Sequence, residues 1–63
     1  MDNLKQLRKS NKFSQEEMAR TLNISLRAYQ LKEKGESELK LSEIIVIANK
    51  LGLELTDFIN RIV

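Results

Sequence analysis

The sequence predicts an all-α domain of five short helices. Its 63 residues contain no proline and only two glycines, so few positions interrupt helical structure. Apolar residues recur at intervals of three and four, whereas β-branched residues do not alternate over any long run, as they would in a half-buried strand. A chain of this length is expected to form one domain, here residues 1–63.

The first two helices are predicted from their N-terminal caps. Asp2 is a good N-cap for the first, which is expected to follow it and to end at the break over 11–13. The second is expected over 14–22, because Ser14 and, three residues later, Glu17 form a capping box. The apolar residues expected on the inner faces of these helices are Leu4, Leu7, Met18, Ala19 and Leu22.

The third helix is expected to follow a tight turn. Asn23 lies where the chain must reverse, and asparagine tolerates the left-handed conformation better than most residues. Ser25 is the expected N-cap of the helix over 25–34, and Gly35 ends it at the position where helices favour glycine.

The fourth and fifth helices are separated by Gly52. Apolar spacing predicts the fourth over 41–51, and Thr56 is the expected N-cap of a last short helix. The residues expected to face the core from these two helices are Leu41, Ile44, Ile45, Ala48, Leu51, Phe58, Ile59 and Ile62.

The composition argues against several classes of function. The chain has no cysteine and no histidine, which leaves neither a Cys/His zinc site nor the usual nucleophile and base of an enzyme. It has no glycine-rich phosphate loop, and a chain this short has little room for a concave pocket. We therefore expect no catalytic residues, no metal-binding residues, no cofactor and no small-molecule ligand.

The chain also lacks the signals of a membrane or secreted protein. Its N-terminus has no apolar segment of the signal-peptide kind, and its longest apolar run, IIVIA at 44–48, is far shorter than a membrane span. A cytoplasmic protein without a membrane partner is expected.

Positive charge is concentrated in the N-terminal two-thirds. The net charge is +2, and residues 1–40 carry nine of the eleven Lys and Arg but only six of the nine Asp and Glu. This is the part of the chain to which a polyanion would bind.

The two capped segments 14–22 and 25–34, joined by a tight turn, have the sequence form of a helix-turn-helix. In that motif the first helix crosses the phosphate backbone, and the N-terminal part of the second enters the major groove. An ordinary helical hairpin that only packs in a core would have the same outline, so these two segments by themselves leave both interpretations open.

A longer pattern favours the helix-turn-helix. The segments LKQLRKSNKFSQEEMARTLNISLRAYQLKEKG and LSEIIVIANKLGLELTDF, within residues 4–58, resemble the lambda-repressor-like, Cro-type helix-turn-helix family, also called the XRE family. The matching positions are Leu4, Leu7, Arg8, SQEEMA at 14–19, Leu22, Ile24, Ser25, Tyr29, Glu33, Gly35, Leu41, the IA pair at 47–48, LG at 51–52 and Leu55.

The resemblance implies a five-helix DNA-binding domain with its helix-turn-helix at the second and third helices. Such domains are commonly bacterial or phage repressors that bind a near-palindromic operator as a dimer. Arg8 and Glu33 match a structural ion pair between the first and third helices, and Gln15 matches a position that contacts phosphate. The positions implied to face base edges are Leu26, Arg27 and Gln30.

The residues themselves support part of this assignment. At about 100° per residue, Arg27 and Gln30 fall on one face of the third helix, and Ala28 and Tyr29 fall on the opposite face. Arginine can donate two hydrogen bonds to guanine O6 and N7, and glutamine can pair with adenine N6 and N7. Leu26 can offer only an apolar contact, for instance to a thymine methyl group.

Four further side chains are expected to contact phosphate, together with the free amides of the two helix N-termini. They are Gln15, Ser25, Lys34 and Lys40. Each has an ordinary alternative, because an exposed lysine or glutamine is commonly just solvated surface and a serine before a helix is favoured as a cap.

Three features depart from the family pattern. Lys32 stands where the family usually has an inward apolar residue, so either its stem packs while its ammonium reaches solvent, or the helix rolls to bury Leu31. The loop ESEL at 36–39 brings two acids near the expected phosphate path, and Leu26 and Leu31 make the outer surface of the base-reading helix unusually apolar. Together they predict modest affinity, reliance on dimerisation, or a protein partner on that face.

The expected partners are double-stranded DNA and a second copy of the chain. The tail FINRIV at 58–63 stays apolar to its end, and Ile62 and Val63 are the expected dimer contacts. A symmetric dimer would set two recognition helices about one DNA turn apart, roughly 34 Å. The alternatives are a protein-interaction module that reuses the fold, and an antitoxin or control protein of a two-gene system, which sequence alone does not separate from a repressor.

Overall fold

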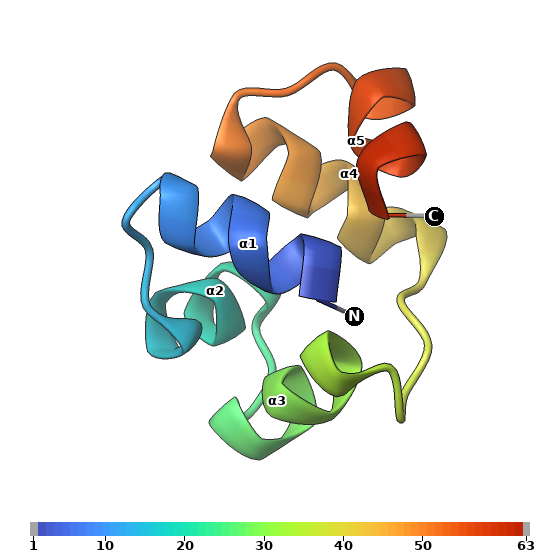
Figure 1. The fold of residues 1–63 in the computed structure, drawn as a ribbon. Helices are drawn as coiled ribbons and strands as arrows, with labels where there is room; N and C mark the ends of the chain where they lie inside the picture. The colour runs from blue at the N-terminus through green and yellow to red at the C-terminus, as the bar shows by residue number, and fades with distance from the viewer. Residues whose placement is uncertain (1, 63) are drawn as a thin grey trace.

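The computed structural model describes residues 2–62, which form five α-helices joined by short connections (Figure 1). Their bounds are α1 Asp2–Ser10, α2 Gln15–Leu22, α3 Leu26–Lys34, α4 Leu41–Leu51 and α5 Leu55–Ile62. The predicted fold class and the order of its helices are confirmed. No helix within residues 2–62 has the length and apolar character needed to cross a membrane.

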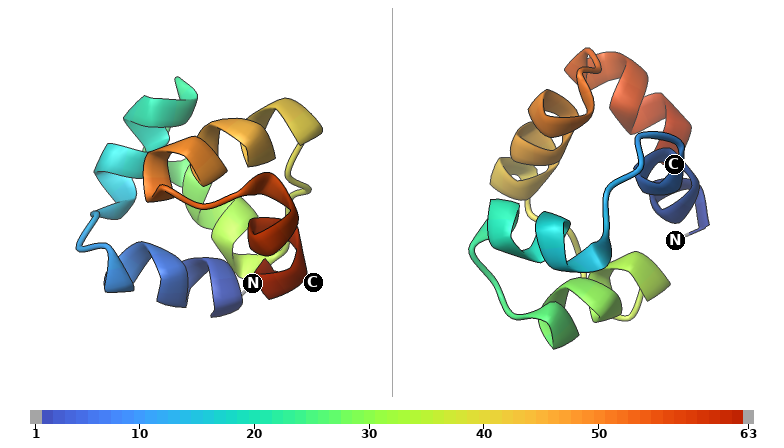
Figure 2. Two further views of the ribbon diagram at one scale, coloured as in Figure 1. Left: turned by 90° about the horizontal axis from the view of Figure 1, so that it is seen from above. Right: turned by 90° about the vertical axis from the view of Figure 1, so that its left-hand side faces the viewer.

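The helices close into a ring around the core. α1 packs against α3, α3 against α2, α2 against α4, α4 against α5, and α5 returns to α1. The ring is visible in the right-hand view of Figure 2, and in Figure 1 α3 lies at the opposite end of the molecule from α5. α3 is therefore held from one side and turns its other side outward.

The turn and cap residues of α2 and α3 take the conformations that the sequence predicts. The Ser14 hydroxyl accepts from the Glu17 N–H, and the Glu17 carboxylate accepts from the Ser14 N–H, each at 3.0 Å, which completes the capping box of α2. The Ser25 hydroxyl accepts from the amide three residues on, at 3.1 Å. Asn23 and Gly35 end α2 and α3 in the left-handed region, with φ of 56° and 84°.

Each helix contributes one large, fully buried side chain to the core. These residues are Leu4, Met18, Tyr29, Ile47 and Phe58. Removing such a side chain from water is worth about 1.5–3 kcal/mol. Because the five come from all five helices, the core links the N-terminal helix to the helix-turn-helix and to the C-terminal pair.

α4 turns a different face to the core from the one predicted. Leu41 is 64% exposed and Ile45 is 41% exposed, whereas Ile47 is fully buried, so the prediction that Leu41 and Ile45 face the core is wrong. Large apolar residues occur on nearly every side of this helix, and packing against α2 and α5 selects the face that contains Ile44, Ile47 and Leu51.

Two helix starts also differ from the prediction. α1 begins at Asp2 itself rather than after it. α5 begins at Leu55, so Thr56 lies inside the first turn and is not the N-cap. The Phe58 N–H donates to the Glu54 carbonyl at 2.9 Å, and this bond starts the helix before the threonine.

Candidate nucleic-acid interface

The connection between α2 and α3 is a hydrogen-bonded turn. The Asn23 N–H donates to the Arg20 carbonyl, and the Ile24 N–H donates to the Ala19 carbonyl, each at 3.0 Å. The Ile24 side chain packs against the core. These bonds satisfy two of the last four carbonyls of α2, and together with the packed isoleucine they fix the direction in which α3 leaves the turn.

The inner side of α3 carries a buried lysine. Lys32 is 7% exposed, its Nζ donates to the Glu38 carbonyl at 3.0 Å, and it lies 3.1 Å from Oε1 of Glu43. Neither expected arrangement occurs, because the ammonium is not in solvent and Lys32 does not exchange its inward place with Leu31, which is only half-buried. The hydrogen bond instead joins the end of α3 to the following loop, and the ion pair joins it to the start of α4.

The outer side of α3 is open along its length. Leu26, Arg27 and Lys34 are exposed, and Gln30 is half-buried between them. Among residues 2–62, this helix therefore presents an exposed arginine and, one turn further on, a half-buried glutamine that contacts α2.

Arg8 of α1 and Glu33 of α3 form a two-pronged ion pair in the interior. Arg8 Nε donates to Glu33 Oε2 at 2.9 Å, and its Nη2 donates to Oε1 at 3.1 Å. The remaining nitrogen, Nη1, donates to the Phe13 carbonyl at 2.8 Å. The two side chains are 8% and 4% exposed, so one guanidinium joins α1, the α1–α2 connection and α3 through largely desolvated bonds.

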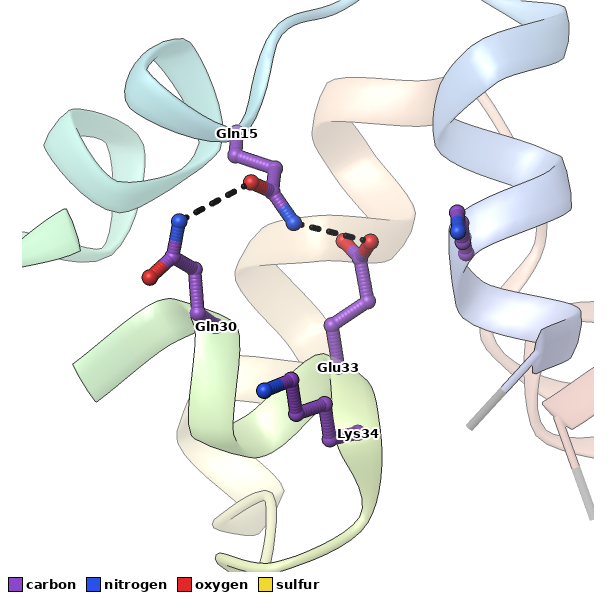
Figure 3. A pocket seen from close by; sticks show the side chains of 5 residues that line it. Gln15, Gln30, Glu33 and Lys34 are labelled. Atoms are coloured by element: carbon purple, nitrogen blue, oxygen red, sulfur yellow. Dashed lines mark hydrogen bonds between the residues drawn. The ribbon is translucent and has the colours of Figure 1, made fainter. Parts of the chain in front are cut away.

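Two glutamines extend the ion pair toward the outer surface (Figure 3). Gln15 Nε2 donates to Glu33 Oε1, and Gln15 Oε1 accepts from Gln30 Nε2, both at 3.2 Å. These three residues line an open polar hollow of about 310 Å³ together with Lys5 and Lys34. Lys5 was not predicted as part of the site, although its position three residues before Arg8 puts it on the same side of α1.

The pKa values of two carboxyl groups are lowered by these contacts. Burial by itself raises the pKa of Glu33, but interactions with Arg8, Tyr29 and Gln15 outweigh it, so the pKa lies below its ordinary value. Burial likewise raises the pKa of Glu43, and the Lys40 backbone amide and the Lys32 ammonium more than compensate, so its pKa is also lowered.

These shifts predict a loss of stability at low pH. A carboxyl group with a lower pKa in the folded state stabilises the fold above its unfolded pKa of about 4.5, and this contribution disappears as pH falls through the folded pKa. We expect the melting temperature, followed by circular dichroism, to stay level from about pH 7 to pH 5 and to fall below about pH 4.5. Glu33→Gln should fall less steeply, and an unchanged melting temperature at about pH 3 would contradict the prediction.

A family model described as Helix-turn-helix matches residues 4–58, most of the chain and the whole of the arrangement described above. The chain belongs to the helix-turn-helix family. It is a Cro- and XRE-type helix-turn-helix domain, which is a DNA-binding domain of transcription regulators. Neither the curated proteins nor the solved structures gave a significant match to the chain.

The other predicted contact residues of this helix-turn-helix domain lie in different settings. The Ser25 hydroxyl accepts the capping bond of α3, which leaves its proton to donate elsewhere. Lys40 is exposed directly before α4. Ile62 is half-buried and packs against the core, and Val63 lies outside the described residues.

Proposed function

We propose that this helix-turn-helix domain is a transcriptional repressor that binds a near-palindromic DNA operator as a homodimer, with α3 in the major groove. The observation that carries the proposal is the uncovered outer side of α3, where Arg27 is exposed and Gln30 lies one turn further on. This is the half of the helix that enters the groove in helix-turn-helix proteins. A cytoplasmic location in a bacterial or phage-infected cell follows from this role.

Three side chains are proposed to contact base edges. Arg27 would donate two hydrogen bonds to a guanine, and Gln30 would pair with an adenine. Leu26, 38% exposed at the start of α3, would pack against a thymine methyl group. None of the three belongs to the buried core.

Phosphate contacts are proposed for residues that surround the polar hollow and the start of α3. Gln15 is the first residue of α2, where backbone amides without intrahelical partners attract an anion. Lys34 lines the hollow on its α3 side, and the Ser25 hydroxyl proton can be donated to a phosphate oxygen. Lys40 would reach the backbone from the start of α4.

The dimer is proposed to form through Ile62 and Val63 at the C-terminal end. Leu55 is 38% exposed on α5. Ile59 and Ile62, on the same side of the helix, are half-buried, and Ile62 packs against the core, so the apolar stripe is partly uncovered. An apolar stripe of this kind, repeated in a second copy by two-fold symmetry, gives a self-complementary surface.

The proposal predicts steeply salt-dependent binding to duplex DNA of any sequence. Fluorescence anisotropy of a labelled random duplex at about 50 and 200 mM salt measures this, because each neutralised phosphate adds roughly −0.9 to the slope of log K against log salt. Lys34→Gln should reduce the magnitude of that slope by about one for each bound chain, whereas Arg61→Gln, which removes a positive charge from α5, should leave it unchanged. No binding of any duplex at the lower salt would overturn the proposed function.

One observation favours a second candidate function. Leu41, Ile45 and Val46 are all exposed on α4, and with Leu26 they leave more apolar surface uncovered than a DNA contact requires. A protein-interaction module that reuses the fold would explain this surface. It would be supported if the chain failed to bind duplex DNA at low salt.

An antitoxin or a control protein would bind DNA through the same residues as a repressor.

A further inference from the structure

The hydrogen bonds from Arg8 to Gln30 form an unbroken chain from the interior to the outer surface. Arg8 Nη2 donates to Glu33 Oε1 at 3.1 Å, and the same oxygen accepts from Gln15 Nε2 at 3.2 Å. Gln15 Oε1 then accepts from Gln30 Nε2 at 3.2 Å (Figure 3). The chain begins at a buried ion pair and ends at a half-buried side chain on the outer side of α3.

The direction of every bond in this chain is fixed by the residue types. Arginine can only donate, and an ionised carboxylate can only accept. Gln15 must therefore turn its amide nitrogen toward Glu33, which turns its oxygen toward Gln30. That oxygen can only accept, so Gln30 must turn its own amide nitrogen toward Gln15.

Gln30 is left with a defined pair of free groups. One N–H is used by Gln15, so the side chain keeps one N–H and its carbonyl oxygen for a ligand. Adenine offers a matching pair in the major groove, the N6 amino donor and the N7 acceptor. Guanine offers two acceptors, O6 and N7, which would need two N–H groups, and Gln30 has only one to give.

The geometry points to a specificity relay, in which Arg8, Glu33 and Gln15 orient the Gln30 carboxamide so that it selects adenine over guanine. This inference rests on the proposed DNA-binding function and deepens it by naming one base of the operator. Gln15 and Glu33 act as positioning residues, because they reach the base only through Gln30. The same orientation leaves the second N–H of Gln15 to donate to a phosphate, so the base contact and a backbone contact share one hydrogen-bond network.

The relay is tested with base analogues in a duplex selected from a random library by the wild-type protein. Each adenine is replaced in turn by 7-deazaadenine, which lacks the N7 acceptor, or by purine, which lacks the amino donor. At one adenine of each half-site, both analogues should weaken wild-type binding by roughly 5- to 150-fold. Gln30→Ala should bind less tightly and should not distinguish adenine from either analogue at that position.

The positioning role is tested with Gln15→Met, which keeps the length of the side chain and removes its amide. At the same adenine, the preference over guanine should fall by about two- to tenfold, the worth of one hydrogen bond. Gln6→Met makes the same substitution at an exposed glutamine of α1 and should keep the wild-type preference. Urea unfolding of both variants checks that each is folded.

The outcomes separate the relay from the function on which it rests. Duplex binding without any adenine that is sensitive to both analogues would overturn the relay and leave the proposed function in place. An unchanged adenine preference in Gln15→Met would also overturn it, because orientation through Gln15 would then have no effect. Failure of the wild-type protein to bind any duplex would overturn the proposed function and the relay together.

Discussion

Arg8→Met is expected to lower the free energy of unfolding by about 3–5 kcal/mol, the cost of leaving one member of a buried ion pair without its partner. The Glu33 side chain is 4% exposed and would keep its charge in the interior with no cation beside it. The Phe13 carbonyl would also lose the hydrogen bond that it accepts from Nη1 at 2.8 Å. A domain below about 70–80 residues rarely has more than about 3–5 kcal/mol from its core, so much of this variant should be unfolded at room temperature.

Urea denaturation followed by circular dichroism measures this effect. Arg20→Met, at an exposed position of α2, is the matched control and should change the free energy of unfolding by less than about 0.5 kcal/mol. The double variant Arg8→Met/Glu33→Met removes both charges and should recover a large part of the loss, because no buried charge is left unpaired. A single variant within about 1 kcal/mol of the wild type would contradict the reasoning.

The sequence predicted the helices well where local chemistry alone decides the structure. Ser14 and Ser25 cap their helices because a serine oxygen can reach an amide two or three residues on. Asn23 and Gly35 end helices because both tolerate positive φ. These preferences operate within a few residues, so they can be read from the chain without knowledge of its neighbours. Lys12, with φ of 62°, shows the limit, because its left-handed conformation has no such signal in the residue type.

The prediction failed where packing against other helices decides the structure. Helical spacing in α4 fits a face containing Ile45 as well as one containing Ile47, and only contact with α2 and α5 distinguishes them. Lys32 shows the same limit for charges. Its ammonium is buried because Glu43 and the Glu38 carbonyl come within 3.1 Å of it, and neither contact follows from the local sequence around the lysine.

The sequence predicted individual residues of the candidate site but not the hydrogen bonds that join them. The exposed Arg27 and the outward-facing Gln30 follow from the angular spacing of the third helix. The bond between Gln15 and Gln30 joins uncharged residues fifteen positions apart, and two glutamines on separate helices carry no sequence pattern that predicts it. Lys5 was missed by the prediction for the same reason, because only the packing of α1 against α3 brings it to the polar hollow.

Removal of both base-reading side chains gives the largest expected effect on DNA binding. In Arg27→Ala/Gln30→Ala, each half-site of the selected operator loses two bidentate base contacts, worth about 1–3 kcal/mol each. The affinity for that operator should therefore fall by about 2–6 kcal/mol per half-site, or roughly 30-fold to 20,000-fold. Random duplex DNA should be bound almost as before, with little change in the salt slope, because the phosphate contacts remain.

Anisotropy titrations with the selected operator and with a random duplex at the same salt concentration separate these two quantities. Loss of a residue that contacts a base changes the ratio of the two affinities, whereas loss of a phosphate contact lowers both affinities by a similar factor. Lys34→Gln is the matched comparison, because it removes a positive charge from the same helix and should weaken both duplexes by similar factors. If the double variant weakened the operator and the random duplex equally, Arg27 and Gln30 would be phosphate contacts, and α3 would not be the helix that reads the sequence.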